Sequence, residues 1–234
     1  ILEKPQAATD LDQYGQLLRS RLRLLAGVKV IRHLRGLREH RISPHPSTAR
    51  PELVAIGASL GGPRALAAIL RALPASFPVP IAVVQHIADG FTEGLATWLA
   101  TETRLDVREA RDGDRLRPGL VVLAPTGRHL LVGEGVARLS DAAPLDGFKP
   151  SVTPLLASAA HAYGARACGV ILTGMGRDGA AGLRAIKDAG GPTLAQDEAT
   201  SAVFGMPRAA IELGAVDRVL PLEAIPRALV ELTR

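Results

Sequence analysis

The sequence predicts an α/β fold, a doubly wound and mainly parallel sheet with helices on both faces and a β-hairpin insertion. Short apolar runs of strand length alternate with stretches of helical pattern, as in chains that build parallel sheets. The apolar runs lack the polar alternation of a strand with one solvated face, so both faces of the sheet should be buried. The core should be aliphatic, because 47% of the 234 residues are hydrophobic but only four Phe, two Tyr and one Trp are aromatic.

The elements follow in order from residue 53. Four runs read as buried strands: Leu53–Gly57, Ile81–Gln85, Leu120–Ala124 and Gly169–Thr173. Four stretches read as helices, the first with a proline near its start and the last closed by two glycines: Pro63–Leu73, Thr92–Thr103, Val152–Tyr163 and Ala180–Ala189. Residues 105–148 instead show short alternating pieces, His129–Gly133 and Val136–Ser140, and are predicted to form the hairpin insertion.

The N-terminal segment differs from the rest in charge. Residues 1–50 hold ten Lys and Arg against four Asp and Glu, whereas residues 51–234 hold eighteen against nineteen. Leu11, Leu18, Leu22 and Leu25 lie on one helical face among arginines, which predicts a basic amphipathic helix before a linker, Ile42–Pro51. We therefore expect two parts, residues 1–51 and 52–234. A solvated helix is favoured over a nucleic-acid or membrane-surface contact, because no aromatic side chains are interleaved for stacking.

Composition excludes several classes of protein. A single cysteine, Cys168, cannot form an internal disulfide, and 22% charged residues is ordinary for a globular chain. No apolar stretch approaches the roughly 18 residues of a membrane span, and no signal-peptide pattern opens the chain. We expect a cytoplasmic protein without membrane insertion. Because the chain begins with Ile1, we also expect a part of something longer.

Reactive side chains follow three of the expected strands. Gly57–Pro63 contains a G-x-S-x-G turn that exposes Ser59 beside the start of a helix; the second run ends at Gln85 and His86; and Asp178 follows the fourth run. Carboxyl ends of parallel strands meet at one edge of a sheet, which is where ligands bind. A hydroxyl, an imidazole and a carboxylate should therefore lie together there, as in a serine hydrolase.

Other interpretations fit each residue alone. The glycine turn could cradle a phosphate, His86 could be a polar strand end, and Asp178 could cap the next helix. A dinucleotide site, however, should have an acidic residue where Gln85 and His86 stand, and the glycine spacing fits neither G-x-G-x-x-G nor a P-loop. The six histidines show no metal-binding spacing. A non-catalytic phosphate- or nucleotide-binding regulatory module remains the alternative.

The order of the three residues, serine before histidine before aspartate, occurs in a family that eight ordered blocks of residues 52–230 resemble. These blocks are Ile56-Gly-Ala-Ser-Leu-Gly-Gly62, Val84-Gln-His-Ile87, Arg111-Asp-Gly-Asp114, Ala124-Pro-Thr-Gly-Arg-His129, Lys149-Pro-Ser-Val152, Ile171-Leu-Thr-Gly-Met-Gly-Arg-Asp-Gly-Ala180, Ala195-Gln-Asp-Glu-Ala199 and Val203-Phe-Gly-Met-Pro207. Together they resemble the catalytic domain of CheB, the protein-glutamate methylesterase of bacterial chemotaxis. Leu2–Pro5 likewise resembles the end of the receiver domain that precedes the esterase in this family.

The resemblance implies an activity and assigns roles. Such enzymes hydrolyse glutamate methyl esters on methyl-accepting chemoreceptors and often deamidate receptor glutamines, without metal or organic cofactor. Carried over, Ser59 is the nucleophile, His86 the general base and acid, and Asp178 the group that orients the imidazole, while the Met175 N–H is an oxyanion donor. By the geometry of the turn, we expect the Leu60 N–H to be a second donor.

Partners and departures complete the comparison with the family. The resemblance implies an upstream receiver, phosphorylated by a histidine kinase, whose phosphorylation site lies outside this chain, and no nucleic-acid partner. Two positions depart from the family pattern: Leu60 stands where threonine is usual, and Thr153 where aspartate is common.

Overall fold

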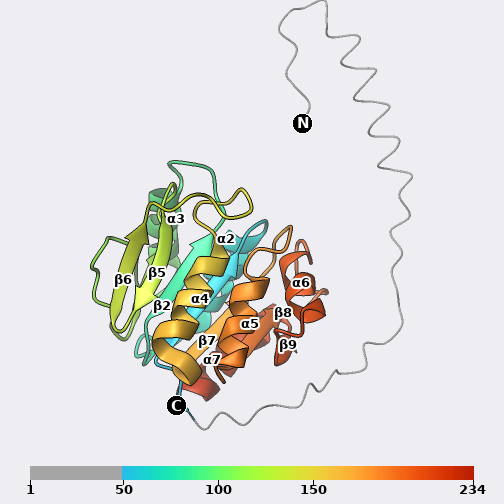
Figure 1. The fold of residues 1–234 in the computed structure, drawn as a ribbon. Coiled ribbons are helices and arrows are strands. Elements are labelled where there is room, and N and C mark those ends of the chain that lie inside the picture. Colours follow the sequence, from blue (N-terminus) through green and yellow to red (C-terminus); the bar gives the residue numbers. More distant parts are fainter. Residues whose placement is uncertain (1–48) are drawn as a thin grey trace, which may run out of the picture. The chain divides into compact units, whose positions relative to one another are not determined.

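The structure, a computed structural model, describes residues 49–234 and consists of a sheet with helices on both faces (Figure 1). The α/β class is therefore confirmed. The expected basic helix and most of the linker lie outside the described residues. No helix within the described part of the chain is long and apolar enough to cross a membrane.

Seven strands form the main sheet in the order β3-β4-β2-β1-β7-β8-β9, and every neighbouring pair is parallel. Their bounds are β1 Leu53–Ala58, β2 Ile81–Gln85, β3 Asp106–Glu109, β4 Leu120–Leu123, β7 Ala167–Ile171, β8 Thr193–Gln196 and β9 Arg218–Leu220. The four expected apolar runs are the neighbouring strands β4, β2, β1 and β7. Every residue of these four strands is buried, as continuous apolar runs predict.

Within residues 49–234, six α-helices cover the sheet: α2 Gly62–Ala72, α3 Thr92–Glu102, α4 Val152–Tyr163, α5 Ala180–Asp188, α6 Met206–Glu212 and α7 Ile225–Thr233. Side chains of α2, α3 and α7 share one buried cluster with Val54 and Ile56 of β1. Side chains of α4, α5 and α6 share the other cluster with Leu53 and Ala55, and Figure 1 shows α4 and α5 in front of the sheet. Alternate residues of one strand thus serve two cores, each fully buried Leu or Ile contributing about 2 kcal/mol.

The hairpin has the predicted bounds, with β5 His129–Gly133 and β6 Val136–Ser140 paired antiparallel as a separate two-stranded sheet. Its buried residues Leu130 and Val132 belong to the same cluster as α4. The predicted extent of the insertion, residues 105–148, was too wide. Asp106–Glu109 within it is strand β3 at one edge of the main sheet, and its polar sequence hides this because an edge strand is only partly buried.

The strand order places a topological switch point at the end of β1. From β1 the chain continues to β2 on one side, while β7 pairs with β1 on the other. Such a reversal separates the loops that follow the two strands and is the usual ligand site of an open parallel sheet. The loops after β1, β2 and β7 hold Ser59, His86 and Asp178.

Candidate active site

Ser59 lies directly after β1, against the loop that follows β7. Its N–H donates to the Thr173 carbonyl at 3.0 Å. Gly174 allows this close approach, because a Cβ at that position would lie 2.7 Å from the Ser59 Cβ and 2.3 Å from the Met206 sulfur. A side chain at residue 174 would therefore displace the serine.

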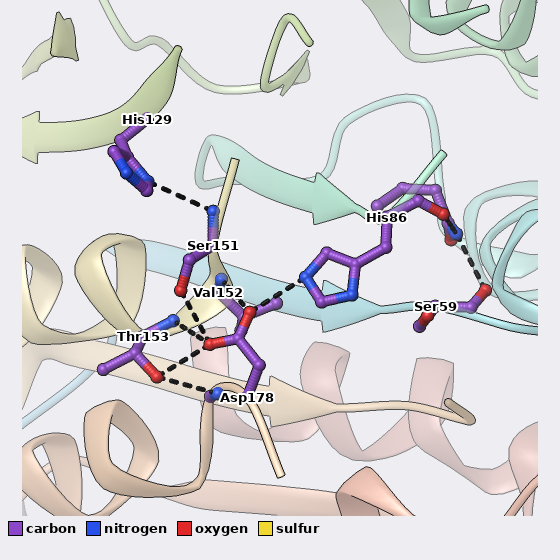
Figure 2. A network of polar contacts seen from close by, with 9 residues as sticks. Ser59, His86, His129, Ser151, Val152, Thr153 and Asp178 are labelled. Atoms are coloured by element: carbon purple, nitrogen blue, oxygen red, sulfur yellow. Dashed lines mark hydrogen bonds and ion pairs between the residues drawn. The ribbon is translucent and has the colours of Figure 1, made fainter. Parts of the chain in front are cut away.

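His86 and Asp178 are in direct contact. The imidazole Nε2 lies 2.8 Å from Oδ2 of the carboxylate, and the two side chains are 9% and 3% exposed. Figure 2 shows the imidazole between the carboxylate and Ser59. Within the described chain the Ser59 hydroxyl makes no hydrogen bond to His86. Such bonds are often long in enzymes without substrate and tighten when substrate binds.

Asp178 accepts four further hydrogen bonds from the start of α4 (Figure 2). Oδ2 accepts the Val152 N–H at 2.7 Å; Oδ1 accepts the Ser151 hydroxyl at 2.7 Å, the Thr153 hydroxyl at 2.8 Å and the Thr153 N–H at 3.0 Å. Burial alone would raise the pKa of Asp178, but the bonds from His86 and from the start of α4 outweigh it and lower this pKa to about 2. The carboxylate is therefore ionised at neutral pH.

The interpretation of Asp178 as a cap for the helix that follows it is wrong. That helix, α5, begins after Gly179, whose φ of 89° is a left-handed conformation that favours glycine, and it has no side-chain cap. Asp178 instead caps α4 from across the structure. The positive end of a helix stabilises a carboxylate, so α4 helps to keep Asp178 charged.

The contact with Asp178 fixes which nitrogen of His86 is available. An ionised carboxylate only accepts hydrogen bonds, so Nε2 must carry the hydrogen. In the neutral ring the lone pair is then on Nδ1. Nδ1 is buried and has no hydrogen-bond partner in residues 49–234. It is the atom of His86 that is free to accept a proton from a hydroxyl.

A second serine and histidine lie beside Asp178, but their contacts do not suit catalysis. The Ser151 hydroxyl donates to the carboxylate rather than to a base, and only its backbone N–H reaches Nδ1 of His129, at 3.2 Å. The other nitrogen of His129, Nε2, faces the Ala143 carbonyl at 3.1 Å. Ser151 and His129 are also buried, at 0% and 2% exposure, where no protein substrate reaches. Ser151 therefore holds Asp178 by a hydrogen bond, and His129 in turn holds the backbone of Ser151.

Gln85 connects the serine loop with the histidine loop. Its buried amide nitrogen donates to the Ser59 carbonyl at 2.7 Å and to the His86 carbonyl at 2.8 Å. The His86 N–H in turn donates to the Ala58 carbonyl at 3.0 Å. The backbones of the predicted nucleophile and base are therefore held at a fixed separation.

The two predicted oxyanion donors have free backbone N–H groups. The N–H groups of Leu60 and Met175 take part in none of the hydrogen bonds found in residues 49–234. Leu60 and Met175 are 61% and 73% exposed. The Leu60 carbonyl accepts the Thr173 hydroxyl at 2.9 Å, which holds the turn after the serine. Leucine in place of threonine leaves both this bond and the backbone donor intact.

Comparison with known proteins places this geometry in a family. The family model described as CheB methylesterase matches residues 54–229, which include every residue of the site. This chain belongs to the CheB methylesterase family. It is 76% identical over 234 residues to protein-glutamate methylesterase/protein-glutamine glutaminase 2 of Anaeromyxobacter dehalogenans, covering all of this chain and 69% of that protein. It is 49% identical over 239 residues to the protein-glutamate methylesterase FrzG of Myxococcus xanthus, again 69% of that protein.

A solved CheB structure has the same fold. The crystal structure of the Thermotoga maritima CheB methylesterase catalytic domain superposes with a TM-score of 0.74 at 42% identity, covering 78% of this chain and 98% of that one. The resemblance read from the sequence blocks is thereby confirmed at the level of family and fold.

The CheB sequence blocks contained site residues whose roles the sequence did not reveal. Ser151 and Val152 lie in one quoted block and Gln85 in another, but nothing in their spacing indicates contacts with residues 26 or 27 positions away. Thr153, which the sequence marked only as a departure from the family pattern, makes two hydrogen bonds through its hydroxyl. The hydroxyl donates to Asp178 and accepts the Gly179 N–H at 2.9 Å.

Proposed function

We propose that this chain hydrolyses methyl esters of glutamate side chains in proteins and deamidates glutamine side chains. Ser59 acts as nucleophile, His86 as general base and acid, and Asp178 as the anchor of the imidazole. The observation that carries the proposal is the 2.8 Å contact between His86, which follows β2, and the ionised carboxylate of Asp178. This pair lies beside Ser59 in a CheB methylesterase fold.

The chemistry follows from the free nitrogen of His86. The Ser59 oxygen attacks the ester carbonyl while Nδ1 takes the hydroxyl proton, and the resulting oxyanion accepts hydrogen bonds from the Leu60 and Met175 N–H groups. The imidazolium then gives its proton to the departing methoxide, which leaves as methanol. Water attacks the acyl-enzyme by the same route, releasing glutamate and restoring Ser59. With glutamine the first leaving group is ammonia.

Asp178 and the oxyanion donors stabilise opposite charges that develop during the reaction. The carboxylate stabilises the positive imidazolium, and the two N–H groups stabilise the negative oxyanion. Because Asp178 is already ionised and fully hydrogen-bonded, it needs no rearrangement when the charge develops. Removal of one oxyanion donor typically costs about 10²–10³-fold in kcat, which sets the scale for these groups.

The proposed substrate is a methyl-accepting chemoreceptor, and the proposed compartment is the cytoplasm. A modified side chain on a folded receptor must project into the site. The exposed residues Leu60 and Met175 near Ser59 suit a site that is open to such a protein substrate. A receiver domain ahead of the esterase, phosphorylated by a histidine kinase, belongs to the same proposal, which rests here on the sequence of Leu2–Pro5.

The test is methanol release from a helical peptide that carries a glutamate γ-methyl ester. The wild-type chain and a Ser140→Ala control, whose serine lies on the hairpin, should release methanol at equal rates, and Ser59→Ala should release none above background. Equal release by wild type and Ser59→Ala would overturn the assignment. No release by wild type, together with micromolar nucleotide binding, would favour the phosphate-binding module instead.

A further inference from the structure

An aromatic ring covers one face of His86. The Phe148 ring lies parallel to the imidazole, with centroids 4.2 Å apart and an angle of 5° between the planes. Phe148 is only partly buried and is not a member of either hydrophobic core. Its contact with the imidazole therefore needs an explanation other than core packing.

A tight turn presents this ring to the imidazole. Leu145 and Phe148 exchange two backbone hydrogen bonds, at 3.1 and 2.9 Å, around Asp146 and Gly147, whose φ angles are 50° and 83°. Two consecutive positive φ angles define a type I′ turn, which has little freedom. The chain then runs directly to Ser151, which binds Asp178. One segment, residues 145–153, thus contacts both the imidazole and the carboxylate.

The stacking geometry suits a charged imidazole better than a neutral one. The parallel stack places the imidazole over the face of the Phe148 ring. A cation over the face of an aromatic ring is attracted by the negative face of its π system, and the attraction grows when water is excluded. The contact between Phe148 and His86 therefore strengthens when the imidazole gains a proton.

We propose that Phe148 is a positioning residue for ester hydrolysis, acting through His86. Its ring holds the imidazole in the plane that joins Asp178 to Ser59, and it stabilises the imidazolium that forms as Ser59 attacks. An interaction that is stronger in the transition state than in the ground state raises kcat rather than lowering KM. This inference rests on the proposed function, since it assumes that His86 is the base.

The test compares side chains that keep or lose the π face. Phe148→Leu keeps apolar bulk without a π face and should lower kcat for the γ-methyl ester peptide about tenfold, with KM changed less than about twofold. Phe148→Met serves as a second variant of this kind. Phe148→Tyr keeps the ring and should stay within about twofold of wild type. Val219→Ala, an exposed apolar position on the edge strand β9, is the control and should leave kcat unchanged.

A second background separates catalysis from folding. In a His86→Ala chain, Phe148→Leu should change the residual rate less than about twofold, because the group through which Phe148 acts is gone. A Phe148→Leu chain with wild-type kcat, a Phe148→Tyr chain as impaired as Phe148→Leu, or an undiminished effect in the His86→Ala background would overturn the inference alone. A wild-type chain that releases no methanol would overturn the proposed function, and this inference with it.

Discussion

Asp178 is 4% exposed and its two carboxylate oxygens accept five hydrogen bonds, whereas Leu60 and Met175 near Ser59 are 61% and 73% exposed. We call these regions the acid end and the serine end of the site. The acid end is held by the start of α4, and the serine end leaves its hydroxyl and two N–H groups without partners in the described chain. The negative charge of Asp178 is thus held in place at the acid end, whereas the N–H donors at the serine end remain free for the substrate. Substitutions at the serine end should therefore affect activity alone, and those at the acid end activity and stability together.

The largest effect is expected at the serine end. Ser59→Ala and His86→Ala should each lower kcat by several orders of magnitude, up to about 10⁶-fold, because attack and proton transfer are one event. The double variant should be scarcely slower than either single variant. Thermal denaturation should give the same melting temperature for Ser59→Ala and wild type. Multiplicative losses in the double variant would show that the two residues do not act as a unit.

Asp178→Asn tests the acid end. Turnover should fall by about 10⁴-fold, because an amide neither holds the required tautomer nor stabilises the imidazolium. The amide NH₂ would also face donors from Ser151, Val152 or Thr153, so the free energy of unfolding should drop by about 1–3 kcal/mol. The control is Asp188→Asn, whose exposed carboxylate pairs with Arg184. An Asp178→Asn chain as stable as wild type would contradict the contrast between the two ends.

Lowering the pH should reduce the stability that the Asp178 carboxylate provides. The pKa of Asp178 lies near 2 in the folded chain against 3.8 for an ordinary aspartate, so the unfolded state takes up the proton first as the pH falls. The stability that Asp178 provides is thus present above pH 4 and is lost toward pH 2, and amounts to roughly 2 kcal/mol. Urea titrations at pH 7, 4 and 2 should show wild type losing that much more than Asp178→Asn. Parallel pH profiles would refute the assignment of this stability to Asp178.

Thr153 should show a smaller effect at the acid end. Thr153→Val removes the hydroxyl between Asp178 and Gly179 at constant shape and should lower kcat about tenfold, or about 1.4 kcal/mol. Thr153→Ser restores the hydroxyl and should recover most of that loss. Steady-state rates on the methyl ester peptide measure both. A valine variant with wild-type kcat would mean that the remaining donors suffice.

The smallest effect is expected from the N-terminal segment. Deleting residues 1–50 should leave turnover on a small soluble ester within about threefold, because both ends of the site are built from residues 58–179. A crystal structure of a CheB catalytic domain alone, matching 78% of this chain, supports a folded truncation. A folded but inert truncated chain would give the N-terminal segment a part in the site.

Periodicity predicted the parts of the fold in which burial alone selects the residues. The runs 53–57 and 81–85 are buried throughout, and residues 130–133 of the hairpin alternate between buried and partly exposed. Strands β8 and β9 and helices α6 and α7 were not predicted. Thr193 and Gln196 are buried in β8, but hydrogen bonds to Asp217 and Thr173 satisfy them, and a polar strand of four residues has no apolar signature. β9 has three residues at the sheet edge.

The site residues likewise fall into those that the sequence predicts and those that it does not. Ser59, His86 and Asp178 could be found because each follows an apolar run, and parallel strands bring such positions to one edge. The residues that hold them could not, because Thr153 and Phe148 act on side chains 25 and 62 positions away. Tertiary contact between a turn, a helix start and two strand ends leaves no regular spacing in the sequence.

The most direct test of the proposed catalytic site is to identify the serine that forms the covalent intermediate. The chain is treated with a fluorophosphonate probe, digested, and the modified peptide is identified by mass spectrometry. We predict a single adduct on Ser59, formed much more slowly in His86→Ala and absent in Ser59→Ala, with Ser151 unmodified throughout. An adduct on Ser151, or labelling that persists undiminished in Ser59→Ala, would contradict it.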